Sequence, residues 1–414
     1  MRGFASRHPK EKPRTMESKA ELVTGWRLTL LWLAGIDLRL TILAVPPVLP
    51  LIHRDLALNE KAVAALTGLP VLLFGLVAVP GSLMIARLGA RRATIAGLLL
   101  VAVASALRGL GPSAPMLFLM TFVMGAGVAI MQPALPALVS AWFAARPALA
   151  TAVYANGLLV GETLSASLTI PLVLPLVGGS WPQSFVLWAV PVLASAVLIA
   201  LGTPHVPRDE SAPRRRWWPD WRHPHTWQLG IVLGGGSAIY FSCNAFIPDY
   251  LHAIGQPELV NASLTALNAG QLPGSFIILL FARQLAGRRA PFIVTALAAL
   301  AGLAGLLTAN PLVMVASAAL VGFAAAFVLI LTLALPPLLA PAEDVHRLSA
   351  GMLAIGYIVT FLIPYLGGAI WDATDITATA FLAGAAGAVT VLVTALRLQL
   401  REAAKQGMAA NGAR

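Results

Sequence analysis

The sequence contains few charged residues and almost no cysteine. Lys, Arg, Asp and Glu make up 11% of the 414 residues, whereas a soluble globular domain carries about 25%. Such a shortage excludes an ordinary water-soluble domain, because too few charged side chains exist to cover its surface. The single cysteine, Cys243, excludes an intrachain disulfide and a two-cysteine redox motif.

Sequence motifs of enzymes are missing as well. The chain has no His-Glu-x-x-His, no cysteine cluster and no Gly-x-Ser-x-Gly, and no P-loop lysine follows the glycines 234–236. We therefore expect no catalytic residues, no cofactor and no metal. The first 25 residues are polar and basic without an apolar core, so no cleavable signal peptide is expected.

What the chain has instead is long apolar segments. Hydrophobic residues make up 58% of the sequence and the mean hydropathy is +0.82. A helix needs roughly 20 apolar residues to cross a membrane, and only helices or closed barrels satisfy their backbone there. We predict an all-α membrane protein with twelve transmembrane helices at Trp26–Ile52, Ala62–Met84, Ala93–Leu110, Ala114–Trp142, Ala148–Val177, Gln183–Leu201, Trp227–Leu251, Asn261–Phe281, Pro291–Thr308, Leu312–Leu339, Leu348–Ile370 and Thr377–Leu398.

The basic residues predict how the chain is oriented. With these spans, 24 of the 28 Lys and Arg residues fall on the side of the two termini, whereas Arg54, Lys61 and Arg108 fall on the other and Arg39 lies within a span. Cytoplasmic loops are the ones enriched in Lys and Arg, so we predict cytoplasmic termini in a bacterial inner membrane. The net charge of +11 is thereby explained without a nucleic-acid partner.

Short motifs repeat between the two halves at offsets of 193–200 residues, which indicates a duplication. The paired motifs are Pro80-Gly81-Ser82 with Pro273-Gly274-Ser275, Ala134-Leu135-Pro136 with Ala334-Leu335-Pro336, and Gly157 with Gly356. We predict five parts: an N-terminal tail (1–25), a first six-helix bundle (26–201), a central cytoplasmic loop (202–226), a second bundle (227–398) and a C-terminal tail (399–414). The Trp and Arg residues of the central loop are expected at the lipid headgroups.

The loop after the second span has a glycine followed by a basic turn, and this pattern resembles the signature of the major facilitator superfamily. Its residues are Gly81, Arg87, Gly89, Arg91 and Arg92, with Arg283 as the counterpart of Arg87 in the second half. The usual acidic residue is replaced by Ala86. The resemblance implies two pseudo-symmetric six-helix bundles, alternating access, a monomer, and a role for these loops in gating.

The first span resembles more narrowly the cyanate and 2-nitroimidazole permease group. The motif is Asp37-Leu38-Arg39-Leu40 followed by Pro46 and Pro47. Two residues depart from the group, since Asp37 replaces an Asn and Leu40 replaces a Pro. Both lie next to the expected substrate site, so the resemblance implies a small polar solute without identifying cyanate.

Arg39 is the strongest candidate for substrate contact. It is 13 residues from either end of its predicted span, which places it at the membrane midplane, where such transporters bind. Its planar guanidinium suits an oxyanion or a carboxylate. The alternative is a structural ion pair with Asp37 or Glu162. On a continuous helix, Asp37 would point about 200° away from Arg39.

Glu162 is the second central charge. A buried carboxylate can bind a coupling proton, and Asp37 is the other candidate for that role; a purely structural role is the alternative for both. Several neutral side chains could contact a small polar solute; the alternative for each is a hydrogen bond between helices. They are Trp32, Gln132, Asn156, Tyr240, Asn244, Asn268, Gln271 and Tyr357.

Together these features predict a secondary transporter for a small anionic or polar solute, with Arg39 at its site. An exporter of neutral heteroaromatic compounds is the alternative, with a cavity lined by Trp32 and Tyr240. A membrane-embedded enzyme or lipid-handling protein is a third class, and the short loops offer no catalytic constellation for it.

Overall fold

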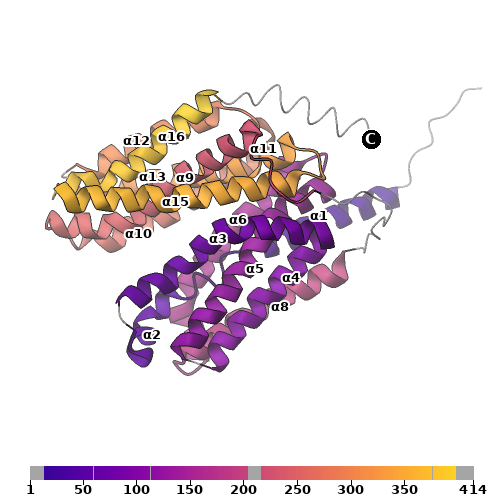
Figure 1. Cartoon of the computed structure of the whole chain (residues 1–414), viewed down its shortest axis with the longest axis horizontal. Helices are drawn as coiled ribbons and strands as arrows, with labels where there is room; N and C mark the ends of the chain where they lie inside the picture. Colours follow the sequence, from indigo (N-terminus) through magenta and orange to yellow (C-terminus); the bar gives the residue numbers. More distant parts are fainter. Residues whose placement is uncertain are drawn as a thin grey trace, which may run out of the picture.

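The computed structural model describes residues 14–58, 60–111, 113–203, 216–308, 310–374 and 376–397. Within these ranges every regular element is a helix, as the sequence predicts. The helices form two groups that lie side by side (Figure 1). They diverge at the end that carries α2 and α10, called here the α2/α10 end. They meet at the opposite end, called the linker end, where the described linker residues 216–223 lie.

The first group contains the helices of the first half. They are α1 (Arg14–Asp37), the 3-10 turn η1 (Pro46–Val48), α2 (Leu49–Leu56), α3 (Glu60–Leu88), α4 (Ala90–Leu110), α5 (Ala114–Trp142), α6 (Pro147–Leu168), the π turn η2 (Thr169–Val173), α7 (Leu174–Leu176) and α8 (Trp181–Gly202).

The second group contains the helices of the second half. They are α9 (Pro224–Ala253), α10 (Leu259–Ala269), α11 (Gln271–Leu285), α12 (Ala290–Leu306), α13 (Pro311–Leu333), α14 (Pro336–Leu339), α15 (Val345–Thr374), the 3-10 turn η3 (Thr377–Phe381) and α16 (Leu382–Arg397). Among the described residues, nine helical stretches are long and apolar enough to cross a membrane. The remaining predicted spans correspond to α1 with α2 and to the shorter apolar helices α12 and α16.

The repeated glycines explain why equivalent helices pack closely in the two groups. A Cβ added at Gly157 of α6 would overlap the carbonyl oxygen of Trp32 in α1. A Cβ added at Gly356 of α15 would lie 2.6 Å from the Leu233 side chain of α9. Small residues of this kind let helix backbones approach each other, so the pair α1–α6 corresponds to the pair α9–α15.

The prediction of one continuous first helix is wrong. The α-helix ends at Asp37, and Leu38–Val45 form successive turns before η1 and α2. Pro46 and Pro47 lack the N–H groups that would bond to the carbonyls one turn earlier, and their rings clash there. The backbone bonds of this stretch mix two kinds of turn: Arg39 donates to Ile36, three residues back, whereas Leu43 donates to Arg39, four residues back.

Two other predicted spans are also interrupted. The eighth divides at Gly270 into α10 and α11. Helix α13 approaches closely at this point, since a Cβ added at Gly270 would collide with the Ala319 carbonyl. The fifth ends in a π turn over Thr169–Val173, which contains Pro171. Proline removes a helical hydrogen bond and loosens the turn around it.

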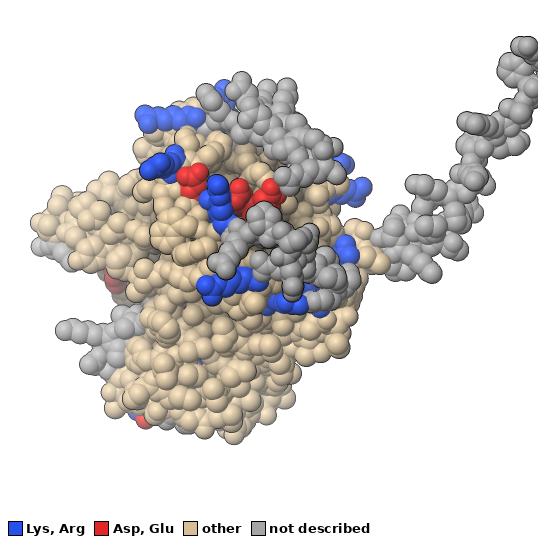
Figure 2. Space-filling model, turned by 45° about the vertical axis from the view of Figure 1, so that its right-hand side comes forward, with Lys and Arg blue, Asp and Glu red and all other residues tan. Residues whose placement is uncertain are grey.

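Lys and Arg side chains gather at the linker end, which Figure 2 brings toward the viewer. Exposed examples are Arg87, Arg92, Arg222, Arg283, Arg288 and Arg289. The two groups of helices are tied together there through the linker. The buried Ser82 of α3 donates to the Trp217 carbonyl at 2.7 Å, and Arg347 of α15 donates to the Trp218 carbonyl at 2.8 Å.

Candidate binding cavity between the bundles

A cavity of about 530 Å³ lies between the two groups of helices. Both halves line it, at mid-length and toward the α2/α10 end. Its lining residues are Arg39, Ile42, Leu43, Val45, Pro46, Leu66, Pro70, Val71, Phe74, Thr121, Met124, Leu158, Leu159, Glu162, Gly236, Ser237, Tyr240, Phe241, Asn244, Gln271, Ala325, Leu329 and Tyr357.

Arg39 reaches this cavity from the turns that follow α1. Its guanidinium carbon lies 5.0 Å from the centre of the Phe74 ring. Within the described residues, no carboxylate lies within 4 Å of it, so neither Asp37 nor Glu162 forms the structural ion pair considered above. A guanidinium held over an aromatic ring in this way still has N–H groups available to bind a solute.

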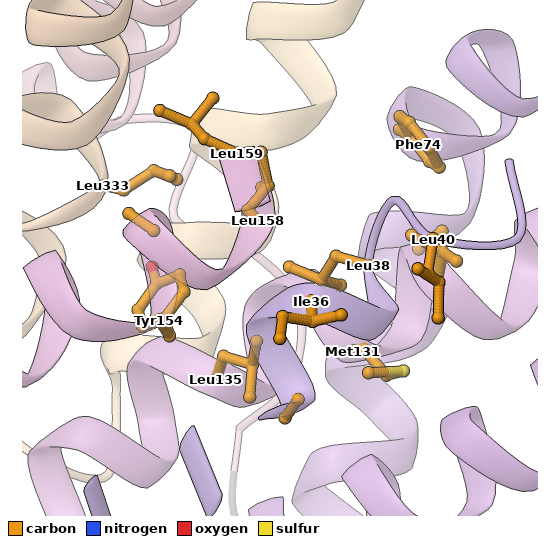
Figure 3. Close-up of a cluster of buried hydrophobic side chains, with 14 of the residues drawn as sticks. Ile36, Leu38, Leu40, Phe74, Met131, Leu135, Tyr154, Leu158, Leu159 and Leu333 are labelled. Carbon is orange, nitrogen blue, oxygen red and sulfur yellow. The ribbon is translucent and has the colours of Figure 1, made fainter. Parts of the chain in front are cut away.

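The turns that present Arg39 are anchored in the first bundle. Leu38 and Leu40, on either side of Arg39, are buried, and Figure 3 shows them among Ile36, Leu158 and other apolar side chains. Because the residues flanking Arg39 point into the bundle core, the Arg39 side chain can point the other way, into the cavity.

Arg108 is a buried cation beside the turns that present Arg39, and it was not singled out from the sequence as a site residue. The sequence prediction placed it near the end of the span Ala93–Leu110 and counted its charge on the outer side, whereas the structure buries it completely in the last turn of α4. One terminal nitrogen donates to the Thr41 carbonyl at 3.1 Å, which is free because Val45 N–H bonds to Ile42. Its Nε and Nη1 have no partner, and its guanidinium carbon lies 4.4 Å from the Phe185 ring centre. The only feature of the sequence that could have indicated its burial was its position before the predicted end of an apolar span.

Glu162 of α6 faces a group of neutral polar side chains from the second half. Its Oε1 lies 2.8 Å from the Tyr240 hydroxyl oxygen, which in turn lies 2.6 Å from Oδ1 of Asn268. Gln271 lines the same cavity as Tyr240. The structure therefore brings together Glu162, Tyr240, Asn268 and Gln271, all singled out in the sequence, across the boundary between the bundles.

Three other predicted contact residues join helices without lining the cavity. Trp32 donates to Oδ1 of Asn156 at 3.0 Å, and Asn156 donates to the Ser275 hydroxyl of α11 at 3.0 Å. Gln132 of α5 accepts a 3.0 Å bond from Tyr357 of α15. The Trp32–Asn156 bond joins α1 to α6 within the first bundle, whereas the Asn156–Ser275 and Gln132–Tyr357 bonds cross from one bundle to the other and close the cavity toward the linker end.

Asp37 lies outside the cavity lining. It is buried in the first bundle, and its Oδ2 has no hydrogen-bond partner. The sequence prediction that Asp37 and Arg39 point different ways agrees with this placement, although Arg39 is not on a continuous helix. Asn244, by contrast, lines the cavity, and its amide donates to the Tyr240 carbonyl.

The residues of the predicted gating loops lie at the linker end. Gly89 has a positive φ of 83° between α3 and α4, a conformation that favours glycine. Arg91 donates to the Thr203 hydroxyl at 2.5 Å and to the Ala200 carbonyl at 2.6 Å, which joins the start of α4 to the end of α8. Gly81 packs against Ile130. Arg87, Arg92 and Arg283 are exposed.

The cavity combines one cation, one carboxyl group and a wall that is mostly apolar. The charged residues in its lining are Arg39 and Glu162. Aromatic surface comes from Phe74, Phe241, Tyr240 and Tyr357. A few placed polar groups in an apolar cleft are typical of a small-molecule site. This arrangement can bind a small solute that has one anionic or strongly polar group.

Comparison with known proteins agrees with this architecture. A family profile described as Major Facilitator Superfamily matches residues 31–312. The chain is 29% identical over 349 residues to the "Cyanate transport protein CynX" of Escherichia coli (strain K12), covering 83% of this chain and 89% of that protein. It is also 29% identical over 341 residues to the "2-nitroimidazole transporter" of the same organism, covering 81% and 86%.

Solved structures show the same fold. The crystal structure of the Major Facilitator Superfamily transporter FucP in the outward conformation superposes with a TM-score of 0.74 at 15% identity, covering 90% of this chain and 99% of that one. The family profile matches well over half of the chain, and the structure has the twelve-span fold with a solute-sized cavity between its two bundles. This protein therefore belongs to the Major Facilitator Superfamily of membrane transporters.

Proposed function

We propose that the protein is a secondary transporter of a small anion, which binds to Arg39 between the two bundles. The observation that supports this most directly is the environment of Arg39. The side chain lines the cavity over Phe74, and no described carboxylate lies within ion-pair distance. An Arg fork in such a place can bind an oxyanion or a carboxylate with two parallel hydrogen bonds.

The shape of the molecule supports transport by alternating access in a bacterial inner membrane. The bundles diverge at the α2/α10 end (Figure 1) and are joined at the linker end. The linker end gathers the basic side chains (Figure 2), which is the pattern of a cytoplasmic face. In this proposal the cavity faces the outside, and the bundles rock to expose it to the cytoplasm. Glu162 and Asp37 are the residues that could bind a coupling proton.

A ligand-induced stability screen tests the proposal. Purified protein is melted with cyanate, acetate, nitrate or 2-nitroimidazole, since a ligand that binds only the folded state raises stability by about 2.7 kcal/mol at one hundred times its Kd. We expect an anion to raise the melting temperature of the wild type and to leave that of Arg39→Gln unchanged. In Arg39→Lys, which keeps the charge but loses the two parallel N–H donors, the anion should raise the melting temperature only weakly. Arg222→Gln, on the exposed linker, is the matched control and should respond like the wild type. An anion response that survives Arg39→Gln would contradict the proposal.

Cysteine labelling tests which end of the cavity is accessible. Cys243 is fully buried, so Cys243→Ala gives a cysteine-free background in which Ser237→Cys places one thiol in the cavity wall. An impermeant thiol reagent should label this variant from outside in intact cells. Labelling only from the cytoplasmic side of inverted vesicles would reverse the proposed orientation.

Export of a neutral heteroaromatic compound is the second candidate. The aromatic and aliphatic lining favours it, and one relative is named a 2-nitroimidazole transporter. In the same screen this candidate predicts stabilisation by 2-nitroimidazole that is equal in the wild type and Arg39→Gln.

A further inference from the structure

The hydroxyl group of Tyr240 has more acceptor neighbours than it has protons. Its oxygen lies 2.8 Å from Oε1 of Glu162 and 2.6 Å from Oδ1 of Asn268. Both distances are those of hydrogen bonds. A tyrosine hydroxyl has a single proton to donate, so one of these two contacts must obtain its proton from the other partner.

Asn268 cannot supply that proton in its observed orientation. Its amide nitrogen donates to the Leu264 carbonyl one turn earlier in α10, at 2.8 Å, so its oxygen is the atom that faces Tyr240. Turning the amide around would place its oxygen 2.8 Å from the Leu264 carbonyl oxygen, where two acceptors would face each other without a proton. The hydrogen of Tyr240 therefore belongs to the bond with Asn268.

The remaining proton must come from Glu162. We propose that Glu162 is protonated in this conformation and donates its proton to the Tyr240 hydroxyl oxygen, which joins α6 of the first bundle to α9 of the second. The Tyr240 oxygen then gives one hydrogen bond to Asn268 and receives one from Glu162, which a hydroxyl group can do at the same time.

This proton controls the charge of the cavity. Besides Glu162, the charged and titratable residues of the described cavity lining are Arg39, Tyr240 and Tyr357. With Glu162 neutral, Arg39 is the one net charge and the cavity favours an anion. With Glu162 ionised, the cavity is neutral overall and the carboxylate competes with the anion for Arg39.

Proton binding and anion binding are therefore coupled, a step that rests on the proposed function. Because coupling between two ligands is reciprocal, an anion at Arg39 also strengthens proton binding at Glu162. One anion and one proton would cross the membrane together, with no net charge moved. We expect the affinity for the anion to be lower when Glu162 is ionised.

Infrared difference spectroscopy tests the protonation without any substrate. The spectrum of ligand-free wild type minus that of Glu162→Gln, at neutral pH, should contain the C=O stretch of a protonated carboxylic acid. That band should shift in Tyr240→Phe, which loses the hydrogen-bond acceptor. Tyr365→Phe is the matched control, because Tyr365 lies on the outer face of α15 with 65% exposure, and it should leave the band unchanged. A difference spectrum with only a carboxylate signal at Glu162 would overturn the inference.

The transport consequence is tested separately, so the two proposals can fail independently. In Glu162→Gln the amide can replace the protonated acid as donor to Tyr240. We expect this variant to bind the anion that the wild type binds, with an affinity that no longer depends on pH, and to exchange it across vesicles without proton-driven accumulation. Accumulation driven by a pH gradient in Glu162→Gln would overturn the coupling. A carboxylic acid band without any anion response would sustain the protonation and contradict the anion proposal.

Discussion

The first and seventh spans occupy equivalent places in the repeat but differ in their backbone. In the second half, α9 runs without interruption from Pro224 to Ala253. In the first half, α1 stops at Asp37 and turns replace the helix. Tyr240 follows Arg39 by 201 residues, close to the repeat offset, so the two central polar residues of the cavity are themselves equivalent positions.

The difference shows how a duplicated fold acquires an asymmetric site. On the intact helix α9, the polar groups that face the cavity are neutral, as with Tyr240 and Asn244. On the broken segment, a permanent cation projects into the cavity while Arg108 bonds the carbonyl that the break leaves free. Irregular backbone within a membrane is tolerated where it lines a cavity, and here it presents the charge.

The largest effect is expected where the two halves pack their equivalent helices. Gly157→Ala would press a methyl group into the Trp32 carbonyl of α1, whose backbone cannot move aside, whereas Gly356→Ala would meet only the Leu233 side chain. Overpacking costs about 1–3 kcal/mol, and we expect Gly157→Ala to fall in that range and Gly356→Ala below it. Melting temperatures of the two purified variants measure the difference. Equal losses would mean that the α1–α6 contact is no more rigid than its counterpart.

A smaller effect is expected at the support of the broken segment. Arg108→Met removes a buried cation with two unpartnered nitrogens, and replacing a buried charge by an apolar side chain is often stabilising, by about 1 kcal/mol or more. The Thr41 carbonyl loses its partner, so the turns that present Arg39 become less fixed. We expect a higher melting temperature together with a weaker anion response. A variant that melts higher and binds unchanged would show that Arg108 does not position Arg39.

The paired serines should separate linker attachment from bundle contact. Ser82→Ala removes the bond to the Trp217 carbonyl, whereas Ser275→Ala removes the acceptor for the Asn156 amide between the bundles. Each loss costs about 1 kcal/mol. We expect only Ser82→Ala to speed tryptic cleavage at Arg216 and Arg222, as followed by gel electrophoresis. Faster cleavage in both variants would mean that the contact between the bundles also protects the linker from cleavage.

The fold was predictable because bilayer crossing imposes a simple pattern on the sequence. Long apolar segments predict the helices, and the duplicated Pro-Gly-Ser and Gly157/Gly356 motifs mark packing contacts that depend on residue type alone. The break after Asp37 was not predicted. Pro46 and Pro47 signal it in principle, but prolines also occur inside intact helices of this chain, such as Pro133 in α5 and Pro248 in α9, so the signal is ambiguous without the neighbouring helices.

The site was predictable in its residue types and less so in its contacts. Arg39, Glu162, Tyr240, Asn244 and Tyr357 line the cavity, because polar side chains are rare in apolar spans and tend to face an interior. Which of them touch depends on the angle between the bundles, and no local pattern encodes that angle. For the same reason Gln132 and Asn156 could not be recognised as residues that join the bundles, nor Trp32 as a residue that bonds to Asn156 within the first bundle.

The smallest effect is expected at the α2/α10 end, where the two halves again differ in the contacts that hold their helices together. In the first half, Trp181 donates to Asp55 at 2.9 Å; in the second, the rings of Tyr250 and Phe381 meet at 4.9 Å. The bond from Trp181, with a second from Arg54, holds the pKa of Asp55 below its ordinary value.

A carboxyl group with a lowered folded-state pKa stabilises the protein above its unfolded-state pKa, and that contribution is lost as the pH falls through the folded-state value. Trp181→Phe keeps a ring but removes the N–H donor, so its melting temperature should fall less on acidification than that of the wild type. Phe381→Leu should leave the acid response unchanged, because no titrating carboxylate takes part in the Tyr250–Phe381 contact. If both variants lose the same stability on acidification as the wild type, Asp55 does not contribute, and the acid response of the two halves would have to be sought in other carboxylates.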